Sequence, residues 1–111
     1  MTEDRAMTVR RMAFEFTPDM DRVFVKDDPE MSFMFLGAWM MLPYLEPYLI
    51  RTMRQALPHI GDPKLVEELK RFCAQEGEHF KQHAKANDII RGLNPAYEAL
   101  RELEAELDSE Y

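Results

Sequence analysis

The sequence predicts an all-α fold. We expect a long antiparallel helical hairpin, half of a four-helix bundle, with a short C-terminal helix and an extended N-terminal arm. Two long segments carry apolar side chains at alternating steps of three and four residues, the period of helices packed in a bundle. Both segments begin with Asp-Pro, at residues 28–29 and 62–63, and Gly61 lies in the turn between them.

Composition and charge narrow the function classes. The chain has 111 residues, of which 46% are hydrophobic, enough for the core of one small domain. The formal net charge is −7 and the Lys and Arg residues form no cluster, so we expect no nucleic-acid partner. A single cysteine excludes an internal disulfide, and the N-terminus lacks the apolar run of a signal peptide, so we expect a cytoplasmic protein.

One uncharged stretch, residues 31–45, resembles a membrane span in composition. It is shorter than the roughly 20 residues that cross a bilayer, and Glu46 and Pro47 interrupt it. We therefore expect no stable membrane insertion. The stretch instead predicts a buried helix, or one that faces an apolar small-molecule substrate.

The first element in order is the extended arm, residues 1–28. It has no helical period, and its segments MAFEF and RVFVK alternate only in part between apolar and polar residues. Pro18 and the aspartates around it predict a turn between these segments. Edge strands are an alternative, but we favour an arm that lies along the surface of the bundle.

The hairpin follows, over residues 29–92. Asp28-Pro29 is a good start for the first helix, because Asp caps a helix and Pro is favoured at its first position. Pro43 and Pro47 fall inside this helix and should bend it near Glu46. The apolar seam of the helix, by which it would pack, consists of Leu36, Trp39, Pro43, Glu46, Ile50, Met53 and Leu57.

A turn over residues 58–62 leads to the second helix, which begins at Asp62-Pro63 and stops near Arg91-Gly92. Its seam is formed by Leu65, Leu69, Phe72, Glu76, His79, His83, Ala86 and Ile90. The C-terminal segment, residues 93–111, should hold a third helix capped by Asn94. We expect its apolar stripe to pack inward, and its acidic face to be solvated. The stripe consists of Tyr97, Leu100, Leu103 and Leu107.

Four side chains on the two seams suggest a metal site. Glu76, His79 and His83 share one helix face, and Glu46 is the only charged residue on the first seam between Leu36 and Leu57. A hairpin folded at Gly61 sets Glu46 and Glu76 at the same height, facing one interior. Buried carboxylates are paired or coordinate metals, and neither seam carries a Lys or Arg.

These ligand types predict a divalent metal, with iron as the first expectation and manganese or zinc as alternatives. The metal ligands would be Glu46, Glu76, His79 and His83. If His83 is not a ligand, it is the candidate catalytic residue, as a general base or by orienting a ligand. The alternative is a core network of hydrogen-bonded Glu and His, with the glutamates protonated.

Three other residues are expected to lie outside the site. Glu78 falls on the far side of the helix from Glu76 and should be solvated. His59 lies in the turn and should be exposed. Cys73 is displaced from the seam and should be a small buried core residue.

A di-metal site of the carboxylate type in a bundle needs a Glu from each of two helices and a Glu-x-x-His from each of two others. This chain supplies one of each, through Glu46 and through Glu76 with His79. The site would therefore be completed either by a symmetric homodimer or by a second half that the chain lacks.

Residues 10–91 resemble the bacterial family of predicted metal-dependent hydrolases. The stretches that carry the resemblance are RRMAFEF, DDPEMS, LPYLEPYLIRTMRQALPHIGDP and FCAQEGEHFKQHAKAN. It implies metal-dependent hydrolysis, with Glu46, Glu76, His79 and His83 as the metal-binding set. Members of that family usually continue with further helices, so we expect a short form or part of a longer protein. The encapsulated ferritins are similar in ligand pattern alone, and it is in this sense that the half-bundle is ferritin-like.

Three function classes remain open at this stage. The first is a metal-dependent hydrolase. The second is a ferritin-like di-iron oxidase or iron-binding module, and the third is a non-catalytic helical interaction domain. An enzyme needs an apolar pocket at the site, whereas a storage protein needs a hydrophilic path to it. The apolar first helix, with Trp39 on its seam, favours the enzyme.

Overall fold

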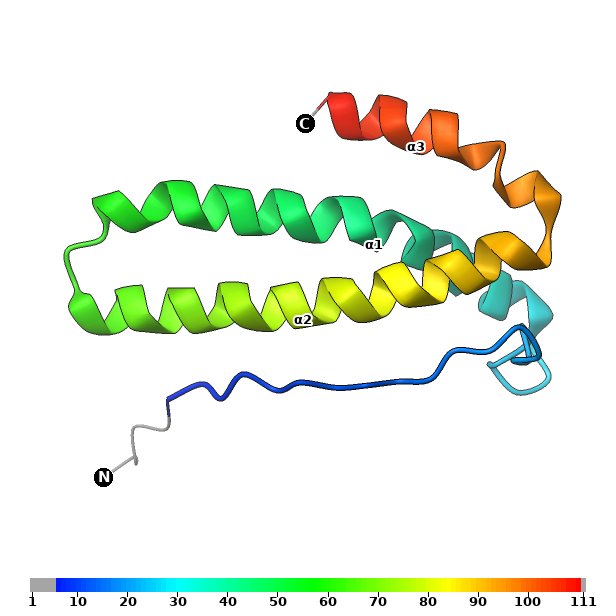
Figure 1. Ribbon diagram of the computed structural model, residues 1–111, viewed down its shortest axis with the longest axis horizontal. Coiled ribbons are helices and arrows are strands. Elements are labelled where there is room, and N and C mark those ends of the chain that lie inside the picture. The colour runs from blue at the N-terminus through cyan, green and yellow to red at the C-terminus, as the bar shows by residue number, and fades with distance from the viewer. Residues whose placement is uncertain (1–5, 111) are drawn as a thin grey trace.

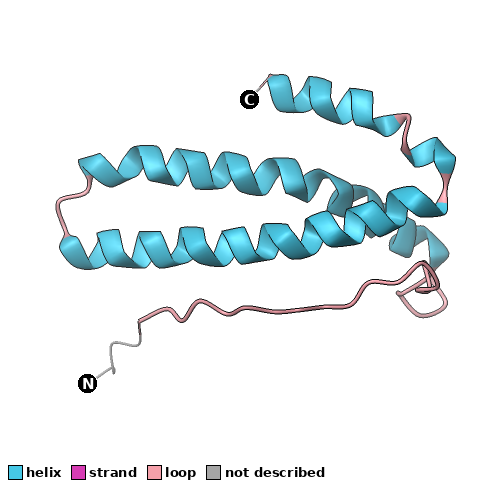
Figure 2. Cartoon of the chain, viewed as in Figure 1, coloured by secondary structure: helices cyan, strands magenta, loops and turns pink. Residues whose placement is uncertain are grey.

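The protein is all-α, as predicted. The computed structural model describes residues 6–110, of which 71% lie in helices and none lies in a strand. The elements are α1 (Pro29–Ala56), a 3-10 turn η1 (Leu57–His59), α2 (Pro63–Leu93), a 3-10 turn η2 (Pro95–Tyr97) and α3 (Leu100–Ser109). Helices α1 and α2 run antiparallel and pack against each other, and α3 folds back over α1 (Figures 1 and 2).

Both long helices begin where the Asp-Pro pairs predict. The side chain of Asp28 accepts a hydrogen bond from the backbone N–H of Met31 at 3.0 Å, and Asp62 accepts from the N–H of Lys64 at 2.9 Å. These carboxylates satisfy donors that have no partner inside the helix. Helix α1 continues through both of its internal prolines and changes direction along its length, as Figure 1 shows.

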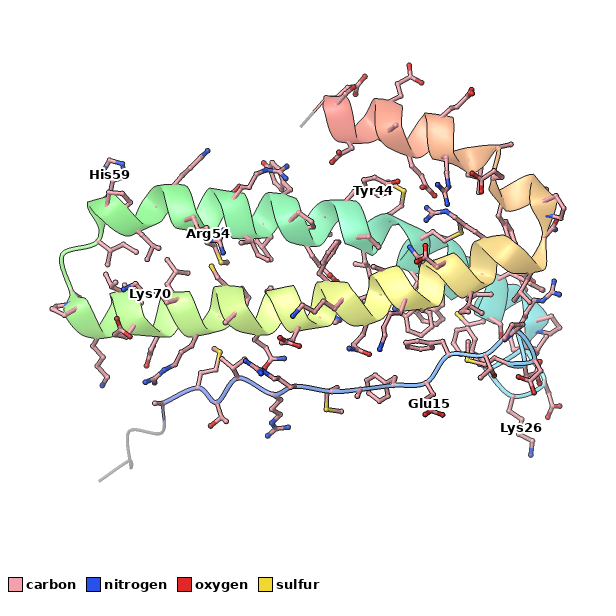
Figure 3. All side chains as sticks on the ribbon, viewed as in Figure 1. Glu15, Lys26, Tyr44, Arg54, His59 and Lys70 are labelled. Atoms are coloured by element: carbon pink, nitrogen blue, oxygen red, sulfur yellow. The ribbon has the colours of Figure 1, made fainter. Side chains whose placement is uncertain are left out.

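The buried apolar core is small. It consists of Met40, Cys73, Ala86 and Ile90, so Cys73 is a core residue as predicted. Asn87 is 1% exposed and donates its amide to the backbone carbonyl of Met40 at 3.1 Å, which fixes α2 against α1. His59 is exposed at the end of the hairpin, also as predicted (Figure 3).

Helix α3 corrects one prediction. Leu103 is 52% exposed, whereas Glu104, on the face expected to be solvated, is 3% exposed. The physical reason is a buried polar cluster in which Glu104 accepts hydrogen bonds from the Arg91 guanidinium and from the Tyr44 hydroxyl. Burial and the Glu104 carboxylate raise the pKa of Tyr44, which lies on the side of α1 that faces α3 (Figure 3). The cluster therefore ties α3 to the hairpin.

The arm lies along the surface of α2, which confirms the preferred prediction for its described part (Figure 1). Gln75 accepts a hydrogen bond from the backbone N–H of Arg10 at 2.6 Å and donates one to its carbonyl at 3.4 Å. Gln82 repeats the pattern, accepting from the N–H of Phe14 at 3.2 Å and donating to the carbonyl of Met12 at 2.8 Å. The side chains of Gln75 and Gln82 thus form the hydrogen bonds to the backbone of the arm that a neighbouring strand would form.

The arm also overturns the prediction for Glu78. Its side chain is 18% exposed, because the arm covers this side of α2. The carboxylate pairs with Lys81 at 3.0 Å and lies 4.0 Å from Nε of Arg11.

By length and composition, residues 29–59 could cross a membrane. A single helix of this kind is also typical of the core of a soluble protein. The window concerned is 17% buried, so most of its apolar residues lie on the outside of the hairpin.

Candidate metal centre

The candidate site centres on a buried carboxylate. Glu46, in the middle of α1, is 3% exposed, and neither of its oxygens has a hydrogen-bond partner among the described residues. Two imidazole nitrogens lie at ion-pair distance from Oε1: Nδ1 of His79 at 3.5 Å and Nε2 of His83 at 3.6 Å. An uncompensated buried carboxylate is costly, so this position calls for protons or for a cation.

The two imidazoles come from successive turns of α2. Their Nε2 atoms are 2.7 Å apart, close enough to share one proton, and the ring centroids are 4.4 Å apart. His83 is buried at 7% exposure, whereas the side chain of His79 is 51% exposed. His83 therefore faces the interior, and His79 gives the site its access to solvent.

Trp39 is the partner of His83 on α1. Its indole N–H donates to Nε2 of His83 at 3.3 Å, and the two rings meet edge to face with centroids 5.5 Å apart. Nε2 of His83 is thus the acceptor for the indole proton and lies beside the Nε2 of His79 as well. The lone pair that accepts the indole proton is the one that a neutral imidazole offers to a metal ion.

Burial shifts the pKa values of Glu46 and His83 in opposite directions. Burial raises the pKa of Glu46, and the nearby Glu76 raises it further while His79 opposes the shift. Burial also lowers the pKa of His83, with His79 acting in the same direction. Each shift favours the uncharged form of its group. A metal ion binds the neutral form of an imidazole, so the lowered pKa of His83 suits it as a ligand.

Glu76 lies beside this group rather than at its centre. Its Oε2 is 3.5 Å from Nδ1 of His79, the same nitrogen that faces Glu46. The two carboxylates, one from each helix, therefore approach the same imidazole. The predicted common height of Glu46 and Glu76 stays a prediction.

Three residues could therefore hold a metal ion: Glu46, His79 and His83 each offer one ligand atom, and these atoms lie within 4.8 Å of one another. Bonds of about 2.0–2.2 Å from nitrogen and oxygen to a divalent ion put two ligands of one ion at most about 4.4 Å apart. The separations of 3.5 and 3.6 Å from Glu46 to the imidazoles fall within that limit. The donor set and its unpartnered carboxylate fit a divalent metal.

A cavity of about 390 Å³ opens onto the two imidazoles. Its walls include Trp39 of α1 together with Met12, Phe14 and Phe16 of the arm. The sequence analysis did not connect the arm with the site. The signal was present in MAFEF, where every second residue is apolar, as expected for an extended segment with one face covered.

Comparison with known proteins gives one match. A family model described as predicted metal-dependent hydrolase matches residues 8–110, nearly the whole chain. No curated protein and no solved structure matches.

Proposed function

The chain belongs to the predicted metal-dependent hydrolase family, and on this premise we propose that it is a hydrolase whose divalent metal is held by Glu46, His79 and His83. The observation that carries the proposal is the buried carboxylate of Glu46. It faces two imidazoles and has no hydrogen-bond donor among the described residues. A core residue kept for stability alone would be paired or apolar.

The residues around the ion would divide the work as follows. A bound divalent ion supplies Lewis-acid polarisation of the scissile bond and lowers the pKa of a bound water. Glu46 contributes the negative charge that its burial otherwise disfavours, and His83 contributes a neutral nitrogen. His79, whose side chain is 51% exposed, contributes a second imidazole nitrogen on the solvent side of the site.

We propose Glu76 as the fourth member of the metal-binding set. Its carboxylate approaches Nδ1 of His79, where it can also orient the imidazole. We assign His83 to metal binding rather than to general base catalysis, because it is buried and its pKa is lowered. Iron is our first expectation for the ion, and manganese and zinc suit the same nitrogen and oxygen ligands.

We also propose that the working unit is a homodimer, which would place two such sets in one bundle. The support is the apolar surface of α1, where Met34 is 59% and Leu45 is 56% exposed. Light scattering should give twice the 13.1 kDa of one chain, and Leu45→Glu should return the mass to that of the monomer. A monomeric wild-type protein would refute this part of the proposal.

The hydrolase proposal is tested by reconstitution. Metal-free protein is loaded with one equivalent of iron(II), manganese(II) or zinc(II), and hydrolysis of ester and amide substrates is followed. We expect activity only in metal-loaded protein, and a loss of about 100-fold in Glu46→Gln. The control is Glu67→Gln, a change at a glutamate that is 60% exposed on α2. Equal rates in Glu46→Gln and wild type would refute the proposal.

A further inference from the structure

The cavity at the site joins apolar walls to the two imidazoles. It measures about 390 Å³, within the range of roughly 300–1,000 Å³ that is typical of small-molecule pockets. Its apolar walls come from two elements far apart in the sequence, the arm with Met12, Phe14 and Phe16 and helix α1 with Trp39. The imidazoles of His79 and His83 line the same cavity.

Most polar side chains that line the cavity already have partners. Gln75 and Gln82 use both the oxygen and the nitrogen of their amides on the backbone of the arm. Glu78 pairs with Lys81 and approaches Arg11. Among the polar side chains that line the cavity, this leaves Arg10 and the two imidazoles to meet a ligand. The cavity thus combines apolar walls with one polar region.

The arm is held in the register that makes this wall. Gln82 follows Gln75 by seven residues, so the two lie about 10.5 Å apart along the axis of α2. About three residues of extended chain span the same length. The two glutamines therefore fix the arm at Arg10 and again at Met12 and Phe14. Alternation then directs Phe14 and Phe16 to the cavity, while Glu15 points away from α2 (Figure 3).

We propose that this cavity is the acyl pocket of the hydrolase, and that it takes a carboxylic ester or amide with an apolar acyl chain. The inference rests on the proposed function for the reaction at the polar end. The chain of the substrate lies against Phe14, Phe16 and Trp39, and its carbonyl lies at His79 and His83. Hydrolysis adds the oxygen of water to the acyl carbon, breaks the bond to the alcohol or amine, and passes the proton to that leaving group.

Binding of two hydroxamates to metal-loaded protein tests the proposal without turnover. Octanohydroxamate and acetohydroxamate share one metal-binding group and differ in chain length, and Trp39, the single tryptophan, reports binding by its fluorescence. We expect the longer probe to bind at least about 30-fold more tightly. The double change Phe14→Ala and Phe16→Ala should remove most of this preference. The matched control is Phe33→Ala, because Phe33 is 46% exposed, close to the 50% of Phe14, and lines none of the cavities described above.

Titration of metal-free protein with octanol and ethanol tests the acyl pocket independently of the proposed metal-dependent function. If the protein takes up no metal, the proposed function fails, and the alcohols still test the pocket. Tighter binding of octanol that is lost in the Phe14 and Phe16 variant supports the pocket. The pocket proposal is overturned if the longer probes bind no more tightly than the shorter ones, or if the Phe14 and Phe16 variant keeps the preference.

Discussion

Replacing Glu46 by Gln should change the stability of the protein in opposite directions without and with metal. In metal-free protein the carboxylate is buried, has no hydrogen-bond donor among the described residues and has a raised pKa. Above the ordinary pKa of 4.5 the unfolded chain releases this proton while the folded chain retains it, so stability falls as pH rises. The loss is about 1.4 kcal/mol for each pH unit over which the two states differ by one proton.

The variant escapes this loss, because an amide does not ionise. At pH 8, metal-free Glu46→Gln should be more stable than wild type by about 1–2 kcal/mol, because a buried charged group left without a partner costs more than a buried amide in the same position. Near pH 4, where Glu46 is protonated in both states, the difference should vanish. A free ion at 100 times its dissociation constant should then add about 2.7 kcal/mol to wild type and little to the variant, which reverses the order.

Thermal unfolding followed by circular dichroism measures both differences. A change of 1 kcal/mol corresponds to about 4 °C in a domain of this size. Melts are recorded at pH 4 and pH 8, with a chelator or with excess metal. The control Glu67→Gln, at an exposed glutamate, should change stability by less than about 0.5 kcal/mol in every condition. If metal-free Glu46→Gln melts below wild type at pH 8, the argument from the buried charge is wrong.

Two further predictions concern the parts that surround the site. Glu104→Gln should lower the free energy of unfolding in urea by about 3–5 kcal/mol, because it leaves the guanidinium of Arg91 buried without its counterion. The exposed Glu102→Gln is the control, and an equal, small effect of both changes would mean that the buried pair does not hold α3. Gln82→Ala should speed tryptic cleavage within the arm several-fold, since it removes two hydrogen bonds to the arm. Gln55→Ala, at an exposed position of α1, should leave that rate unchanged, and an unchanged rate in Gln82→Ala would show that the arm is held in another way.

The hairpin could be predicted from the sequence because its signals are local. An Asp-Pro cap acts within one turn of helix, and a seam at steps of three and four depends on helical geometry alone. Both helix starts, at Pro29 and Pro63, were therefore correct. Glu104 was placed wrongly because its burial depends on the direction in which α3 leaves η2. That direction brings the carboxylate to Arg91 and Tyr44, against the apolar pattern of the helix itself.

The chemistry of the candidate site could be predicted from the sequence. A carboxylate and two imidazoles on facing seams were identified from spacing, and the structure brings Glu46, His79 and His83 together. The contact of Trp39 with His83 was missed, because an indole on a seam of this kind is most often an apolar core residue. The wall contributed by Phe14 was missed because its position depends on glutamines of α2 about 65 to 70 residues away.

The most direct test of the account is the metal content of the protein, measured by elemental analysis after purification without added metal or chelator. The account predicts about one divalent ion per chain in wild type, and little or none in a variant that combines Glu46→Gln, His79→Gln and His83→Gln. Wild-type protein that holds no metal and takes up none on reconstitution would contradict the account. Equal metal in the variant and in wild type would contradict it as well, because the ion would then be bound elsewhere.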